Sequence, residues 1–251
     1  MGNFDMSLWR ITSFTQFDLS EDDGVPHWPC PYCSKHTLIL ENQLIEKVIY
    51  PPEFDEELWS YPFNGHLCCP GCKLIVSICG WMSLEIIDHR LDKDGYSPIY
   101  SKKYTPKYFV PNLQIFYLEK YYPEEISNML NNAFSSYFAD IFSTASYIRC
   151  VIEKMLDYPE FGSIPRSENE EKISLGTRIG KIEDERIKNQ LKAVKWIGNA
   201  GAHLEPMKLT RDDTLQAFNI IQILLEEKYS TRLAELDSFV EKINKNKGGG
   251  D

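Results

Sequence analysis

The feature that most constrains how this chain folds is a Cys-Pro-x-Cys motif that occurs twice in its first third. Two residues between paired cysteines let one tight turn present both sulfurs to the same cation, and proline and glycine inside the pairs suit such a turn. Two turns of this kind complete a tetrahedral set of thiolates, the closed geometry of structural zinc. We therefore expect one structural Zn²⁺ ion, with no open position for water, held by Cys30, Cys33, Cys69 and Cys72.

Other interpretations of the cysteines are open at the level of sequence. A redox site would need only one such pair, in a thioredoxin-like setting. Cys68 directly precedes the second pair and His66 is close to it, so either side chain is an alternative zinc ligand. A saturated zinc ion does not catalyse; it folds a module whose own core is too small. Such a ribbon commonly presents a surface to protein or nucleic acid.

The rest of the N-terminal region has short-strand signals and then turn signals. Brief apolar runs at 38–40 and 74–76 follow the two cysteine pairs, as expected for strands that leave metal-binding turns. We assign residues 1–89 to an N-terminal arm and zinc ribbon. Residues 90–112 contain Asp-Gly and three X-Pro pairs, which predict a linker.

Helical periodicity begins at Pro123, where Glu124 and Glu125 favour a helix start. Predicted helices cover 123–137, 139–157, 173–182 and 184–200, then one from Asp212 or Asp213 through Leu224, and a final polar helix. We expect a helical bundle over 113–243 and a disordered tail at 244–251. The predicted fold class is α+β and mostly α, with a small zinc-ribbon β module followed by an antiparallel bundle of four to six helices.

Charge and hydropathy exclude several classes of protein. The net charge is −10 and the pI is near 5.1, so the chain has no general electrostatic attraction to nucleic acid. No apolar run approaches the roughly 20 residues that span a bilayer, and the N-terminus does not read as a signal peptide. We expect a cytoplasmic protein with no membrane partner, whose partner is a protein or a locally bound nucleic acid.

A second unusual segment lies between residues 195 and 203. In a continuous helix Lys195, Asn199 and His203 share one face, which aligns an ammonium, an amide and an imidazole. Lysine can hold a phosphate, asparagine can orient a substrate and histidine can transfer a proton, so these are the candidate catalytic residues. The alternative is structural: small residues allow close helix packing, Gly201 ends the helix and His203 caps its carbonyl groups.

The combination of motifs resembles a bacterial domain-of-unknown-function family, number 4145. The resemblance rests on the doubled CPxC ribbon, on Arg149-x-x-x-Glu153 and on the later Gly-Asn-x-x-x-His, and it is spread over most of residues 26–230. Members of that family occur alone, in defence islands and attached to restriction-enzyme subunits. The helical part also resembles the HEPN superfamily (higher eukaryotes and prokaryotes nucleotide-binding). Its active members are metal-independent ribonucleases that dimerise around an Arg-x4–6-His motif.

The resemblance implies a zinc-ribbon and HEPN-like protein, which we expect to act as a recognition or regulatory module in antiviral or restriction-associated defence. Asn199 and His203 match the HEPN motif, but Gly198 occupies the position where the arginine is expected. A phosphate in transfer then lacks its main fixed donor, so catalysis should be weak or absent. The rival hypotheses are a ribonuclease that uses His203 as general base and dimerises through the helical domain, and an adaptor whose helices bind a partner protein.

Overall fold

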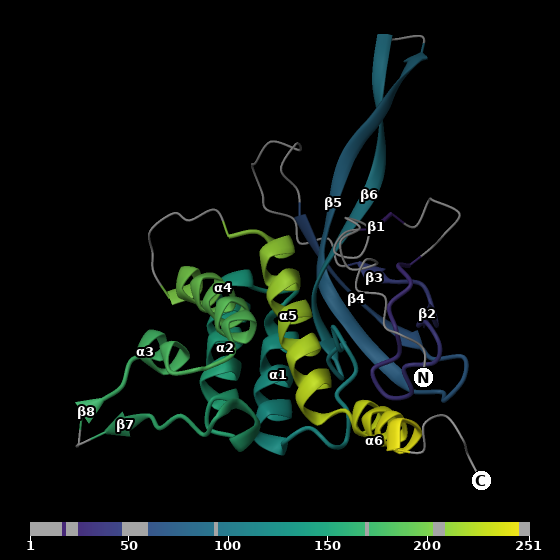
Figure 1. Cartoon of the computed structure of the whole chain (residues 1–251). Helices are drawn as coiled ribbons and strands as arrows, with labels where there is room; N and C mark the ends of the chain where they lie inside the picture. The colour runs from purple at the N-terminus through teal and green to yellow at the C-terminus, as the bar shows by residue number, and fades with distance from the viewer. Residues whose placement is uncertain are drawn as a thin grey trace. The chain divides into compact units, whose positions relative to one another are not determined.

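The computed structural model describes residues 17–18, 25–46, 60–92, 95–168, 171–202 and 209–245. The chain divides into two compact units. The first comprises residues 1–117 and 131–144, and the second comprises 118–130 and 145–251. Both units are drawn in Figure 1.

The first unit contains a six-stranded antiparallel sheet with the strand order β1-β6-β5-β4-β2, in which β3 also pairs with β4. The strands are β1 (Phe17–Asp18), β2 (Ile39–Leu40), β3 (Ile45–Glu46), β4 (Ser60–Cys68), β5 (Ile75–Asp92) and β6 (Gly95–Val110). The strands predicted after the two cysteine pairs are confirmed as β2 and the start of β5. The sheet is nevertheless larger than the small module that we expected, because β5 has 18 residues and β6 has 16.

Most of the segment 90–112, which we predicted as a linker, is strand β6. Strands β5 and β6 form a hairpin, since Asp92 at the end of β5 and Gly95 at the start of β6 are cross-strand partners. Pro98 and Pro106 lie within β6, close to the two register irregularities of the β5–β6 ladder. Proline is tolerated beside bulges and on strands with a free edge, so these residues bend and interrupt the ladder without ending it.

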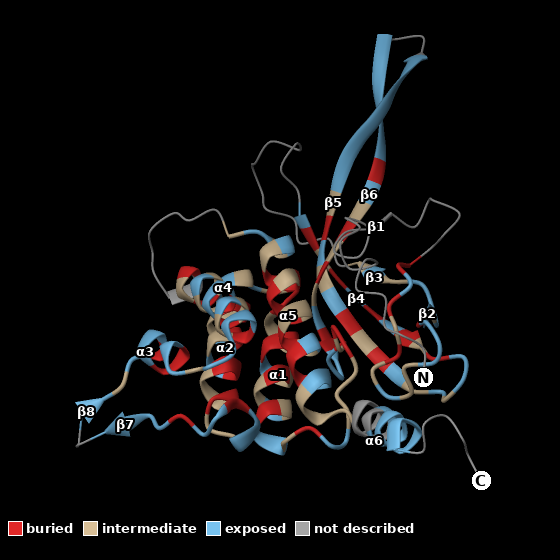
Figure 2. Ribbon diagram, in the orientation of Figure 1, coloured by how far each residue is buried: buried red, intermediate tan, exposed pale blue. Residues whose placement is uncertain are grey.

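Aromatic side chains form much of the core of the first unit. Trp28 is fully buried, and its ring centroid lies 5.0 Å from that of Phe109 in an edge-to-face arrangement. Phe138 packs against Phe109 at 4.7 Å, so residues 131–144 belong to this core. Beyond this core β5 and β6 continue as a two-stranded hairpin arm, defined here as residues 84–91 and 95–100, and all of these residues are exposed (Figure 2).

Among the described residues, six helices follow the sheet, within the range of four to six that was predicted. They are α1 (Glu124–Ser136), α2 (Ile141–Met155), α3 (Leu175–Gly180), α4 (Glu185–Ala202), α5 (Arg211–Tyr229) and α6 (Thr231–Lys245), with a 3-10 turn at Pro159–Phe161 and a small hairpin of β7 (Ser167–Glu168) and β8 (Glu171–Lys172). Polar caps fix two of the starts: Ser174 accepts from the Thr177 amide, and Thr210 forms a capping box with Asp213. No described helix is long and apolar enough to cross a membrane.

Within the second unit, a buried arginine of α3 holds the segment between α2 and α3 in place. Arg178 is 2% exposed and donates to the carbonyl oxygens of Ile164, at 2.6 and 3.1 Å, and of Glu153, at 2.9 Å. It also donates to Oδ1 of Asp157 at 2.7 Å. Because every one of these acceptors lies on α2 or on the chain that leaves it, Arg178 fixes the path of that chain.

Candidate functional site

The structure brings together the four cysteines predicted as metal ligands. Their Sγ atoms all lie within 4.8 Å of one another, with Cys30 and Cys72 at 3.6 Å and Cys33 and Cys69 at 3.7 Å. A Zn–S bond of about 2.3 Å in tetrahedral geometry requires sulfur–sulfur distances of about 3.8 Å. The cluster could therefore hold a metal such as zinc.

The two cysteine pairs adopt the same backbone conformation. The amides of Ser34 and Lys73 each donate, at 3.0 Å, to the carbonyl oxygen of the first cysteine of their pair. Both residues have positive φ values, 50° and 65° respectively. One turn follows the buried Trp28 and the other connects β4 to β5, so the sheet positions both pairs. The Cys72 amide points at Sγ of Cys69 at 3.5 Å, an orientation that favours a thiolate.

The thiols of Cys30 and Cys69 differ in acidity. Burial raises the pKa of Cys30 to about 12. Burial also opposes ionisation of Cys69, but hydrogen bonds from the backbone amides of Cys72 and Gly71, and from neighbouring thiols, lower its pKa to about 7. A bound cation favours the thiolate form of its ligands, so the buried Cys30 depends more on the metal for its ionisation than Cys69 does.

The alternative ligands lie outside the cluster. Sγ of Cys68 donates to the carbonyl oxygen of Cys69 at 3.6 Å, and Nδ1 of His66 lies 3.3 Å from Oγ of Ser77. A nearer histidine is His36, whose Nδ1 lies 3.8 Å from Sγ of Cys33. An N–H donor at this distance stabilises a metal-bound thiolate from outside the ligand set. His36 was not among the predicted zinc ligands or their alternatives, although it stands only three positions after Cys33.

The second candidate site lies on α4, where Lys195 and Asn199 share a helix as predicted. His203 lies outside the described residues. The helix continues to Ala202, so Gly201 does not end it. Nζ of Lys195 lies 4.0 Å from the ring centroid of Trp196 and is close to Gly176 of α3. The ammonium group is therefore directed toward α3.

An arginine from another helix contacts Asn199. Nη1 of Arg149, on α2, donates to Oδ1 of Asn199, and its Nε donates to Oε1 of Glu153 at 3.2 Å. Gly198 makes this contact feasible, because a Cβ atom there would lie 2.6 Å from Cβ of Arg149 and 3.2 Å from the carbonyl oxygen of Ala145. Both halves of this cluster stand out in the sequence, but their pairing does not. A glycine inside a helix was the available signal of a close approach.

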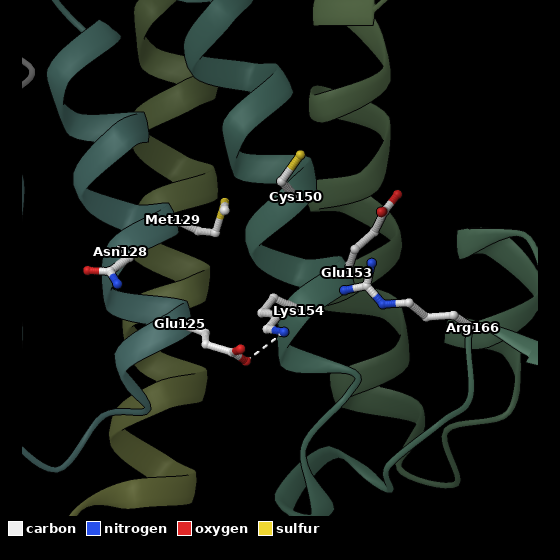
Figure 3. Close-up of a pocket in the computed structure, with 7 residues that line it drawn as sticks. All are labelled: Glu125, Asn128, Met129, Cys150, Glu153, Lys154 and Arg166. Atoms are coloured by element: carbon white, nitrogen blue, oxygen red, sulfur yellow. Dashed lines mark ion pairs between the residues drawn. The ribbon is translucent and has the colours of Figure 1, made fainter.

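A pocket of about 430 Å³ lies beside this cluster (Figure 3). It is lined by Glu125, Asn128, Met129, Cys150, Glu153, Lys154 and Arg166. Lys154 and Glu125 form an ion pair across it at 2.6 Å, and the Arg166 side chain extends toward Glu153. Since Glu153 lines the pocket and also accepts from Arg149, the pocket and the Arg149–Asn199 pair share one carboxylate.

Two family models match parts of the chain. Residues 131–246 match the model of DUF4145, a domain of unknown function. The chain carries a DUF4145 domain. Residues 18–109 match a second model, DUF8608, also a domain of unknown function, and this match includes all four clustered cysteines. No curated protein and no solved structure matches the chain.

The resemblance to DUF4145 that we stated from the sequence is thus confirmed. The matched part of the chain is divided between two family models, where we expected one. The cysteine-rich part matches a model of its own, whereas Arg149, Glu153, Gly198 and Asn199 all lie within the DUF4145 match. His203 also lies within that match. Both residues of the Arg149–Asn199 contact therefore lie within the DUF4145 match.

Proposed function

We propose that this protein is a zinc-binding recognition or regulatory protein with a HEPN-like helical domain, which works in bacterial antiviral or restriction-associated defence. The observation that supports recognition is a closed four-cysteine cluster in a β unit that extends into an exposed arm. The defence role rests on the family resemblance alone. The proposed metal is one Zn²⁺ ion, because four sulfur ligands at tetrahedral spacing suit it.

Metal analysis of matched variants tests the proposed ligand set. The purified wild-type chain should contain one zinc ion per molecule, and Cys69→Ser should lose it. Cys68→Ser is the matched control, because the adjacent thiol lies outside the cluster and the variant should retain zinc. Retention of a full equivalent by Cys69→Ser would exclude this ligand set.

The hairpin arm is the proposed recognition surface. Its large apolar side chains are exposed, among them Ile87 at 63%, Leu91 at 68% and Tyr96 at 75%. An isolated two-stranded hairpin is only marginally stable in water, and exposed apolar side chains at this density are typical of contact surfaces. The net charge of −10 favours a protein partner over nucleic acid for this surface.

Affinity capture with a matched pair of variants tests the recognition proposal. Ile87→Asp should abolish capture of the specific partner, whereas Phe239→Asp, at a similarly exposed apolar position on α6, should not. In the native host, Ile87→Asp should increase phage sensitivity as much as gene deletion does. Unchanged phage sensitivity on deletion, with no partner captured, would reject the proposal.

A second candidate function is a metal-independent ribonuclease, which is favoured by the guanidinium group beside Asn199. In this mechanism His203 takes the proton of a ribose 2′-hydroxyl and the 2′-oxygen attacks the adjacent phosphorus. The bond from phosphorus to the 5′-oxygen breaks, and that oxygen receives a proton. The products are a 2′,3′-cyclic phosphate and a 5′-hydroxyl. Asn199 would orient the substrate and Lys195 would attract its backbone.

RNA cleavage in excess chelator tests the second candidate. Wild-type protein should cleave and His203→Ala should not, with sedimentation showing the homodimer, formed through the helical domain, that the HEPN resemblance implies. Cleavage that persists in His203→Ala, or that comes from a strictly monomeric protein, would contradict this mechanism.

A further inference from the structure

We propose that Arg149 is the phosphate-binding guanidinium of the helical domain and that its ligand is an RNA phosphodiester. The residue comes from α2 and reaches the position that Gly198 leaves open on α4. This inference rests on the second candidate function, and it assigns to Arg149 the role that the missing arginine would have at residue 198.

The packing of α2 against α4 explains why the guanidinium cannot come from position 198. Any side chain there would begin with a Cβ atom 2.6 Å from Cβ of Arg149 and 3.2 Å from its Cα. Both neighbours are close to the α2 backbone and cannot rotate away. Position 198 can therefore carry a side chain only if α2 moves. Glycine lets α2 approach, and this approach brings the Arg149 side chain to Asn199.

Two hydrogen bonds hold the Arg149 guanidinium in place and leave its Nη2 group available as a donor. Nη1 donates to Asn199 and Nε donates to Glu153 at 3.2 Å, which fixes the plane of the group from two sides. Nη2 has no partner among the residues that the structure describes. The Nδ2 amide of Asn199 likewise has none within the described ranges. The Arg149 side chain is 33% exposed, so a phosphate from solvent can reach these donors.

The chemistry of these groups favours a phosphate. A guanidinium presents N–H groups in a planar fork that matches two phosphate oxygens, and the asparagine amide adds a third donor. Glu153 acts as a positioning residue: its carboxylate orients Arg149 and reduces the local positive charge. RNA binding should therefore be modest and should weaken as the salt concentration rises. The Lys195 ammonium group is directed toward Trp196 and Gly176, so the donor beside Asn199 is Arg149 and not Lys195.

Binding of a non-cleavable RNA separates this inference from catalysis. The probe is a fluorescently labelled single-stranded 2′-O-methyl RNA, which lacks the attacking hydroxyl, and the readout is its anisotropy with the full-length protein. Arg149→Gln should weaken binding about tenfold or more, as expected for loss of a hydrogen bond to a charged group. It should also reduce the salt slope by about one. Arg149→Lys should recover only part of the affinity.

Arg186→Gln is the matched control. Arg186 lies on α4, its side chain is 50% exposed and it is ion-paired with Glu227, so its loss should leave binding unchanged. If Arg149→Gln does not fold, Asn199→Asp replaces it, because a carboxylate beside the guanidinium should also weaken RNA binding. Equal binding by wild type and by these variants, or no RNA binding by wild type, overturns the inference.

Parallel cleavage assays distinguish failure of this inference from failure of the ribonuclease function. Arg149-dependent binding of the methylated RNA without any cleavage of unmodified RNA keeps the inference and rejects the ribonuclease. Cleavage that requires His203 but proceeds equally in Arg149→Gln keeps the ribonuclease and rejects the inference.

Discussion

At the scale of single residues, two glycines permit close approaches that organise the two candidate sites. Gly71 lies inside the second cysteine turn, where a Cβ atom would be 2.3 Å from Nδ1 of His36. Gly198 lies inside α4, where a Cβ atom would meet α2. Each glycine thus allows a polar side chain, His36 in one case and Arg149 in the other, to reach its partner.

Gly198→Ala should destabilise the second unit although alanine is the better helix former. The helix propensity gain is about 1 kcal/mol. The added methyl group, 2.6 Å from Cβ of Arg149, should cost about 1–3 kcal/mol or more through overpacking. Urea unfolding monitored at 222 nm measures the difference. Gly180→Ala is the control, because its Cβ would meet nothing within 4 Å. A variant at 198 that is more stable than wild type would contradict the close packing of α2 and α4.

Asp157 should give the second unit an acid-dependent stability. Burial opposes its ionisation, but hydrogen bonds from Arg166 and Arg178 outweigh burial and hold its pKa below the usual value. A carboxyl whose pKa is lower in the folded state stabilises the fold above its unfolded pKa of about 3.9 and loses that contribution as pH falls through the folded pKa.

Asp157→Asn should therefore cost about 1–3 kcal/mol at pH 7, because the buried Arg178 loses its charged partner. The difference from wild type should shrink below about pH 4. Unfolding free energies measured between pH 7 and pH 2 test this. A difference that stays constant across that range would show that ionisation of Asp157 contributes nothing.

At the scale of elements, features that depend on a local sequence pattern could be predicted from the sequence. Features that depend on pairing between distant segments could not. The clustering of the four cysteines and the helix positions follow from spacing and periodicity alone. Strand β6 was missed because Pro98 and Pro106 read as linker signals, and only its pairing with β5 shows that the ladder accommodates them at irregular positions. The contact between Arg149 and Asn199 joins residues 50 positions apart, which a single sequence cannot pair.

Removal of the hairpin arm should leave the fold intact. Residues 87–99 can be replaced by Asn-Gly, a two-residue turn that suits the retained Ile86–Tyr100 pair. Because every described arm residue is exposed, the melting temperature should change by less than about 4 °C, which corresponds to about 1 kcal/mol. Partner capture should be lost. A large drop in melting temperature would show that the arm belongs to the folding unit and is not only a surface for a partner.

At the scale of the whole molecule, the two family matches and the two compact units separate metal binding from the polar site. The cysteine cluster lies in the first unit, within the DUF8608 match. Arg149 and Asn199 lie in the second unit, within the DUF4145 match. The boundaries do not coincide, since residues 131–144 belong to the DUF4145 match but pack in the first unit.

Zinc removal should unfold the first unit before the second. The cluster ties the turn after Trp28 to the turn between β4 and β5, and structural zinc sites of this kind contribute directly to folding free energy. Chelation should shift the fluorescence of Trp28, which is buried in the first unit, while most of the 222 nm signal of α3, α4 and α5 persists. A Trp28→Phe variant identifies the contribution of that tryptophan. Readdition of zinc should restore the signal. Simultaneous loss of both signals would mean that the two units fold as one, so that the RNA-binding test on the helical domain would require the zinc-loaded protein.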